Sequence, residues 1–251
     1  MGKSVIIDCL AESTSRYRDG WAIVVIDVIR ATTTAITAAA TGRRCFPAPS
    51  VEAALAIAAR FDNPLLAGES NGAVPAAFEM DNSPAQLASR GDTHRPLVLV
   101  SSSGTKVIQA AAGCDAVYLA CFRSYSALAG HLARHHERVA VIGAGTKGEF
   151  REEDQICCAW VASALLGRGF VAASSQTSAI VRRWGDAPPT ACLCSRSVDF
   201  LRRIGQVQDL EFILRHIDDL PQVFAVQDGE VRSIQPARTH RPRQLQGSYA
   251  G

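Results

Sequence analysis

A cluster of charged and hydroxyl side chains follows the hydrophobic run at residues 21–26, where the chain is expected to pass from a strand into a helix. The cluster consists of Asp27, Arg30, Thr32, Thr33 and Thr34. A carboxylate at this place can bind a cation and a guanidinium can bind an anion, which the N–H groups and dipole of a helix start also favour. The alternative is structural: Thr32 caps the helix, and Asp27 and Arg30 pair with each other.

A glutamate leaves a second predicted strand and enters a loop that contains glycine. Residues 65–68 form a short apolar run, and Glu69 follows it directly. The loop has too few apolar residues to pack on itself, so it either binds a ligand or partner or is an ordinary surface loop. Downstream, Asn82 and Ser83 precede Pro84. This sequence predicts a helix N-cap whose backbone N–H groups remain available to phosphate.

A serine-rich turn follows the hydrophobic run at residues 96–100. It reads Ser101, Ser102, Ser103, Gly104, Thr105 and Lys106. Small residues let backbone N–H groups approach a ligand, and a lysine beside a helix start adds positive charge. The turn therefore predicts a phosphate cradle, with a plain Ser-rich turn as the alternative. Its glycine spacing is not that of a Walker A loop.

Three glycines after the run at residues 138–142 spell G-x-G-x-x-G. They are Gly143, Gly145 and Gly148. Such a pattern can bind a dinucleotide, so a nucleotide-dependent oxidoreductase is one alternative function. Against it, the next helix is expected to begin about four residues after the last glycine. The next strand-like stretch also ends in Ser-Ser-Gln, without the acid that would bind a ribose.

Two acids, Glu153 and Asp154, stand where that next helix begins. Acids in a first turn commonly do no more than complement the helix dipole. In open α/β sheets, however, ligands bind beyond the carboxyl ends of the strands. The two acids would then join Asp27 and Glu69 in a site for a hard cation such as Mg²⁺, which prefers oxygen ligands.

Apolar, β-branched runs alternate with Ala-rich helical segments, which predicts a three-layer α/β/α fold with a mostly parallel or mixed sheet. We expect one domain over residues 1–234 and a flexible tail over 235–251, because the tail has little apolar content. An Asp228-Gly229 pair between apolar runs predicts a hairpin. The expected strands are 4–8, 21–28, 65–68, 96–101, 116–121 and 138–142; the expected helices are 31–41, 51–60, 84–89, 106–112, 125–135, 153–167, 175–184, 195–204 and 208–217.

Composition argues against several classes of partner. The 26 basic and 24 acidic residues are interspersed and leave a formal charge of +2, so no nucleic-acid footprint is expected. No apolar stretch approaches the roughly 18 residues of a membrane span. The eight cysteines include no C-x-x-C pair, and no secretory signal is recognisable, so we expect reduced thiols and a cytoplasmic location.

In these segments the chain resembles the 2-phosphosulfolactate phosphatase family, from about residue 3 to 234 and in the same order. The departures include Ser70 in place of an arginine, Asp81 in place of a glycine, Ser103 in place of an asparagine, and Lys106 where arginine is common. The matching segments are Val25-Ile-Asp27-Val-Ile-Arg30-Ala-Thr-Thr-Thr34, Gly68-Glu69, Asn82-Ser83-Pro84, Ser101-Ser-Ser-Gly104-Thr105, Glu153-Asp154-x-x-Cys157, and Gly205 with Asp209.

The resemblance implies magnesium-dependent hydrolysis of the phosphate monoester of a small 2-hydroxy acid, a reaction associated with coenzyme M biosynthesis. Mg²⁺ would be held by Asp27, Glu69 and one or both of Glu153 and Asp154. Arg30 and Lys106 would act with the 101–105 turn on the phosphoryl oxygens. The other substrate-binding residues would be Thr32, Thr33, Asn82 and Ser83.

Two questions stay open at this level. Either water or a carboxylate such as Asp27 could attack phosphorus, and the departures at Ser70 and Ser103 also allow a phosphate-binding homologue that has lost turnover. The expected partner is a small phosphorylated hydroxy acid, with neither nucleic acid nor membrane, and a homodimer is the commonest assembly by default.

Overall fold

The computed structural model describes residues 2–234, so the predicted tail at 235–251 lies outside the described residues. One mixed sheet of ten strands has helices on its faces, as expected for an α/β/α fold. The strands are β1 (Ser4–Cys9), β2 (Ala22–Ile26), β3 (Cys45–Ala48), β4 (Leu65–Gly68), β5 (Leu97–Val100), β6 (Ala116–Ala120), β7 (Arg138–Gly143), β8 (Val171–Ala172), β9 (Val223–Gln227) and β10 (Glu230–Ile234). The helices are η1 (Ala11–Tyr17), α1 (Ala31–Ala40), α2 (Val51–Ala58), α3 (Pro84–Ala88), α4 (Gly104–Ala110), α5 (Tyr125–His135), α6 (Glu152–Leu166), α7 (Ser175–Trp184), η2 (Pro189–Cys194), α8 (Arg196–Arg203) and α9 (Val207–Arg215). No helix within residues 2–234 combines the length and apolar character needed to cross a membrane.

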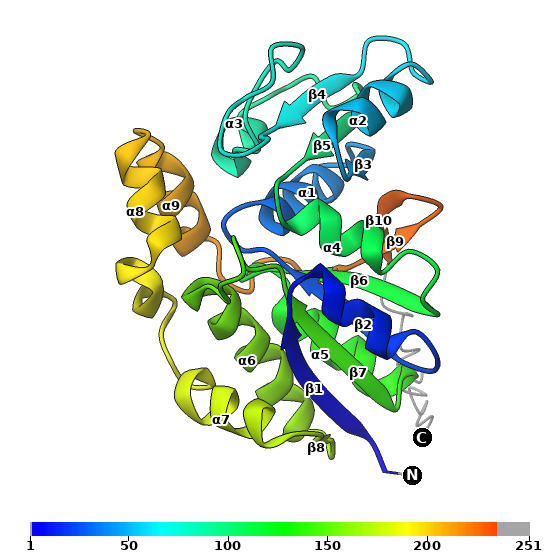
Figure 1. Cartoon of the computed structure of the whole chain (residues 1–251), viewed down its shortest axis with the longest axis vertical. Helices are drawn as coiled ribbons and strands as arrows, with labels where there is room; N and C mark the ends of the chain where they lie inside the picture. Colours follow the sequence, from blue (N-terminus) through cyan, green and yellow to red (C-terminus); the bar gives the residue numbers. More distant parts are fainter. Residues whose placement is uncertain (1, 235–251) are drawn as a thin grey trace, which may run out of the picture.

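The sheet contains two groups of parallel strands, joined by the β9–β10 hairpin. Its order is β4-β5-β3-β10-β9-β6-β2-β7-β1-β8. Three antiparallel pairings separate the groups, so β4, β5 and β3 run opposite to β6, β2, β7, β1 and β8. In Figure 1, β4 and β5 occupy the upper part of the molecule and β1, β2 and β7 the lower part, with α1 and α4 between them.

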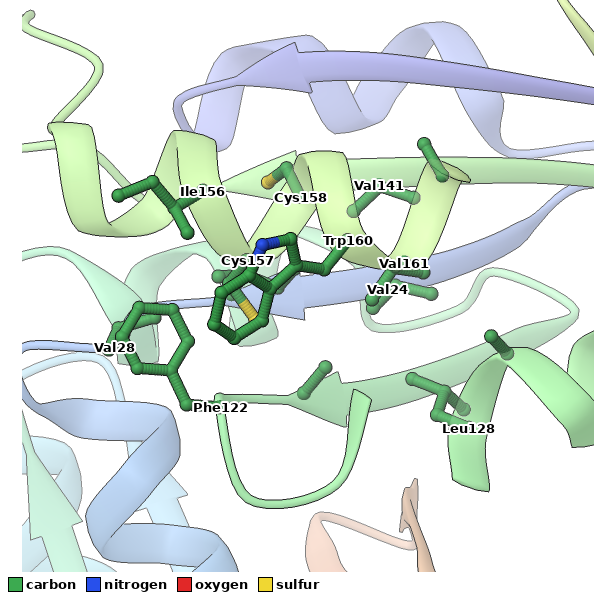
Figure 2. Packing of buried hydrophobic residues seen from close by; sticks show 14 of the residues in the cluster. Val24, Val28, Phe122, Leu128, Val141, Ile156, Cys157, Cys158, Trp160 and Val161 are labelled. Atoms are coloured by element: carbon green, nitrogen blue, oxygen red, sulfur yellow. The ribbon is translucent and has the colours of Figure 1, made fainter. Parts of the chain in front are cut away.

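The hydrophobic pattern of β2 explains how both faces of the sheet are filled. Because successive side chains in a strand point to opposite faces, Val24 and Ile26 join one core cluster, while Ile23 and Val25 join another. On the first face α6 covers the sheet, and Figure 2 shows Trp160 and neighbouring α6 side chains among the strand residues. On the second face lie α1 and α4. The two cores fix the turn that leaves β2.

Most of the expected elements are present within a few residues of their predicted bounds. The Asp228-Gly229 hairpin is confirmed, with φ of 52° and 76° at its two central residues. Strand β3 was not expected, because Pro47 interrupts its four residues and a proline usually argues against a central strand. The proline is tolerated because β10 pairs with β3 at one residue pair only, Val231 with Cys45.

Candidate functional site

The threonine hydroxyls after β2 bond to the backbone of their own turn. Thr32 Oγ1 accepts the N–H of Asp27 at 2.9 Å and donates to the Asp27 carbonyl at 2.8 Å. Thr33 Oγ1 donates to the Val28 carbonyl at 2.8 Å, and both threonines are buried. The N-cap position of α1 belongs to Arg30, so the structural alternative in which Thr32 caps the helix is wrong. These hydroxyls fix the turn, and their contact with phosphate stays a prediction.

The carboxyl group of Asp27 is buried against the turn that follows β5. A Cβ on Gly104 would collide with Asp27 Oδ2 and lie 2.7 Å from the Cβ of Ala31, so this contact requires glycine. Burial raises the pKa of Asp27 to about 7, and the charges of Glu69 and Glu153 add to the rise, although the N–H groups of Ala31 and Gly104 oppose it. The surroundings of Asp27 therefore favour its protonated form over its charged form.

Two further buried acids lie in the first turn of α6. Asp154 accepts the N–H of Val28 at 2.8 Å and the N–H of Gly145 at 3.2 Å, which links the turns after β2 and β7. Burial raises its pKa well above the ordinary value, and the charge of Asp27 adds to this. Burial also raises the pKa of Glu153, which is 1% exposed and whose Oε2 has no hydrogen-bond partner within the described part of the chain. Both acids sit in surroundings that disfavour their charged forms.

Glu69 joins the loop after β4 to the turn after β5. Its Oε1 accepts the N–H of Ser102 at 2.6 Å, and its Oε2 accepts the Ser102 hydroxyl at 2.7 Å and the N–H of Gly72 at 2.7 Å. Ser102 Oγ in turn accepts the N–H of Asn71 at 2.8 Å. Ser102, predicted to bind phosphate, therefore holds a carboxylate in this structure.

Arg30 pairs with two acids from distant parts of the chain. Its Nη1 donates to Asp209 Oδ2 at 2.6 Å and also to the side-chain oxygen of Gln206, while its Nη2 donates to Asp81 Oδ2 at 2.7 Å. The alternative in which Arg30 pairs with Asp27 is therefore wrong. Only 3% of the Arg30 side chain is exposed. These bonds engage three of the five N–H groups of the guanidinium, and its contact with phosphate stays a prediction.

The predicted N-cap before α3 is confirmed and belongs to the same network. Ser83 Oγ accepts the N–H of Gln86 at 3.2 Å and donates to Asp209 Oδ1. Asn82 is buried, its carbonyl accepts the hydroxyl of Thr34 at 2.6 Å, and its Oδ1 has no partner among residues 2–234. Ser83 is thus engaged, whereas the Asn82 side chain offers a free acceptor.

The turn after β5 divides into engaged and free side chains. Thr105 Oγ1 donates to the Ser101 carbonyl at 2.8 Å and accepts the Ser101 N–H at 3.0 Å. Across residues 2–234, Ser103 makes no side-chain hydrogen bond and Lys106, which is exposed, makes no ion pair. Ser103 and Lys106 are therefore the side chains of this turn that remain available to a ligand.

The glycine-rich loop after β7 does not present an open cradle. Thr146 and Glu149 pair across a tight turn, and α6 begins at Glu152, four residues after Gly148. The N–H of Gly145 is taken by Asp154. A dinucleotide phosphate would need such amides free, so the arrangement does not favour the oxidoreductase alternative.

The four acids Asp27, Glu69, Glu153 and Asp154 form the acid cluster, which meets some of the chemical requirements for binding a hard cation. All its donors are oxygens, and Glu153 Oε2 is buried without a partner. Within the described residues, however, no three His, Cys, Asp or Glu side chains gather closely enough to hold a metal ion. A cation here would have to take ligands from water or substrate as well.

Five neighbours of the site were not assigned a role by sequence reasoning. Their side chains are brought in by α8, by α9 and by the loop before α3, far from Asp27 along the chain. The only sequence signals were the weak Gly205 and Asp209 pattern and the departure at position 81. The five are Asp81, Ser195, Ser197, Gln206 and Asp209.

Comparison with known proteins gives one consistent family. A relative from Deinococcus radiodurans is 32% identical over 211 residues, which cover 82% of this chain and 86% of the relative. Relatives from Symbiobacterium thermophilum and Pseudothermotoga lettingae are 38% and 35% identical over 59% and 53% of this chain, and the chain spans only 65% and 58% of their lengths. All three are named probable 2-phosphosulfolactate phosphatase. Because a model of the 2-phosphosulpholactate phosphatase family matches residues 8–229, the chain belongs to that family.

Proposed function

We propose that this protein hydrolyses the phosphate monoester of a small 2-hydroxy acid, with 2-phosphosulfolactate as the first candidate. The observation that carries the proposal is the group of buried acids Asp27, Glu153 and Asp154, in a chain of this family; burial raises the pKa of each, and neighbouring acids add to the rise. Proteins rarely bury like charges together except where chemistry needs them. The names of the relatives supply the candidate substrate.

The cluster suits magnesium, which is part of the proposal. Mg²⁺ keeps several waters and commonly takes only one or two carboxylates together with substrate phosphate, so the lack of a preformed group of three acids is compatible with it. Asp27 and Glu153 are the residues that would hold it, since burial disfavours their charged forms and a bound cation would offset that cost. When bound, the ion supplies positive charge beside the phosphoryl oxygens.

The opposite wall of the site would bind the phosphoryl group. Lys106 is exposed in the first turn of α4, and the unbonded hydroxyl of Ser103 precedes it. An ammonium and a hydroxyl at this place can neutralise oxygen charge as the bond to the leaving alcohol breaks. Gly104 brings the backbone of this turn against Asp27, which is why we assign the two groups to the phosphoryl side of the site.

The experiment that tests the proposal is phosphate release from 2-phosphosulfolactate, phospholactate, phosphoglycolate and phosphomalate, each with and without MgCl₂. Asp27→Asn should lower kcat/KM for the best substrate by at least roughly 100-fold. Asp8→Asn is the matched control, because Asp8 also lies near a strand end but bonds to Tyr17 at 2.7 Å. It should keep most of the activity.

Absence of phosphate release from all four compounds would remove the proposal, and so would full activity in Asp27→Asn. Release without any response to MgCl₂ would leave hydrolysis in place and remove the magnesium part. Trapping of a phosphoryl group on Asp27 would identify the carboxylate as the nucleophile.

A further inference from the structure

Helices α8 and α9 contact five of the segments that carry the candidate site. Arg196 of α8 forms an ion pair with Glu149, in the loop after β7. The ring of Phe200 lies 3.6 Å from the position that a Cβ on Gly72 would take, in the loop after β4. Figure 1 shows the two helices side by side next to α3. The α8–α9 pair therefore lies against the site loops from outside the sheet.

The start of α8 also reaches the acid cluster. The hydroxyls of Ser195 and Ser197 lie close enough to Glu153 to lower its pKa, against the larger effect of burial. Ser195 is itself buried at 1% exposure and caps α8 by accepting the N–H of Val198 at 3.3 Å. The environment of Glu153 therefore depends on where α8 is placed.

The strongest link between the pair and the rest of the site is the Arg30 network. Asp209 of α9 accepts from Arg30, from the Ser83 hydroxyl and from the N–H of Ala85 at 3.2 Å. Gln206, at the N-cap of α9, donates to Asp81 Oδ2 at 2.8 Å. Each terminal nitrogen of the guanidinium has a carboxylate partner, and such planar, charge-assisted bonds fix orientation as well as distance.

We propose that Asp209 is a positioning residue, which docks the α8–α9 pair on Arg30 and thereby completes the site around Glu153. Gln206 supports the same contact by accepting from Nη1 and by donating to Asp81, which holds the Nη2 side of the guanidinium. Arg30 then contributes through the position of α8 and α9 and does not itself touch the substrate. The inference rests on the proposed phosphatase function for its kinetic consequence, but the docking can be measured without a substrate.

Docking predicts a specific kinetic signature. If only a fraction of the molecules has the pair docked, the apparent KM rises by the inverse of that fraction, while saturating substrate selects the docked form and leaves kcat nearly unchanged. Irreversible unfolding gives the reverse result, because substrate cannot recover the lost molecules and the concentration of active enzyme, and hence kcat, falls. The ratio of the two effects therefore separates positioning from stability.

The test uses Asp209→Asn, which keeps the shape of the side chain and removes its charge. We expect KM for 2-phosphosulfolactate to rise about tenfold and kcat to change less than about twofold. Hydrogen exchange of backbone amides in residues 196–215 should become about tenfold faster, while amides of β2 and β7 keep their rates. Should Asp209→Asn fail to fold, Gln206→Ala removes only the second set of bonds and should give a smaller change of the same kind.

The matched control is Glu211→Gln on the same helix. Glu211 is 56% exposed and pairs only with Arg215, at 3.5 Å, so exchange and kinetics should stay as in the wild type. Unchanged exchange in residues 196–215 of both Asp209→Asn and Gln206→Ala would overturn the proposal, as would equal acceleration over the whole chain. If the wild type hydrolyses none of the phosphate esters, the proposed function fails, and the exchange rates still decide whether Asp209 docks the pair.

Discussion

Asp27 and Arg30 stand three residues apart, yet the buried charges around them are arranged in opposite ways. Around Arg30, one guanidinium meets two carboxylates, and hydrogen bonds reach both acids from several sides. Around Asp27, acids crowd one another, their pKa values are raised, and one oxygen of Glu153 has no partner. Compensated charge of the first kind holds segments together, whereas uncompensated charge of the second kind is costly to fold and available for binding.

The largest effect should come from breaking the compensated network. Arg30→Met leaves the Asp81 and Asp209 carboxylates buried without their cation, and we expect the free energy of unfolding to fall by about 3–5 kcal/mol. Arg215→Met is the control, because Arg215 and Glu211 are 77% and 56% exposed in their pair and its loss should cost about 0–1 kcal/mol. Urea denaturation measures both. Equal losses would mean that burial does not distinguish the two pairs.

Removing the charge of Asp27 should raise the free energy of unfolding, whereas removing that of Arg30 lowers it. The pKa of Asp27 is about 7 in the folded protein against an ordinary 3.8, so its protonation stabilises the fold fully below pH 3.8, and that stability is lost as pH rises through 7. Asp27→Asn should therefore raise the free energy of unfolding at pH 8, by up to about 4 kcal/mol, and by less at pH 5. The measurement is urea denaturation in metal-free buffer at both pH values. A variant no more stable than the wild type at pH 8 would contradict this.

The sequence predicted the positions of the acids better than it predicted the hydrogen-bond partners of Arg30, for a physical reason. Periodicity places strand ends, so Asp27, Glu69 and Glu153 could be assigned to turns beyond hydrophobic runs before their neighbours were known. The partners of Arg30 lie 51 and 179 positions away, and no local pattern encodes such a contact. A nearby acid, Asp27, was therefore the natural but wrong partner to consider.

The direction of the strands was equally beyond local pattern. Each apolar run predicted a strand, but the β9–β10 hairpin sits between the two parallel groups and reverses one relative to the other. Pairing of β10 with β3 depends on residues nearly two hundred positions apart, Val231 and Cys45. Topology of this kind is decided by packing of the whole chain.

Magnesium should produce a smaller stabilisation that depends on the same acid. At tenfold excess over its dissociation constant the ion adds about 1.4 kcal/mol, or about 3–6 °C in melting temperature. The shift should be larger at pH 8 than at pH 6, because Asp27 with its pKa of about 7 must lose its proton to act as a ligand. Thermal melts of the wild type and of Asp8→Asn should show it. An equal shift in Asp27→Asn would exclude Asp27 as the ligand.

The smallest expected effect concerns Glu69, which belongs to the acid cluster by position but resembles the compensated network in its bonds. Ser102 supplies two of its hydrogen bonds, so Ser102→Ala should lower the free energy of unfolding by about 1 kcal/mol. The backbone N–H of residue 102 stays in place, which keeps the loss small.

Ser103→Ala should change stability by less than about 0.5 kcal/mol, because its hydroxyl has no bond within residues 2–234. Ser103→Ala should instead raise KM if that hydroxyl contacts phosphate. The opposite outcome would be a loss of stability in Ser103→Ala and a raised KM in Ser102→Ala. It would place Glu69 among the uncompensated acids and require the serine turn to rearrange when the substrate binds.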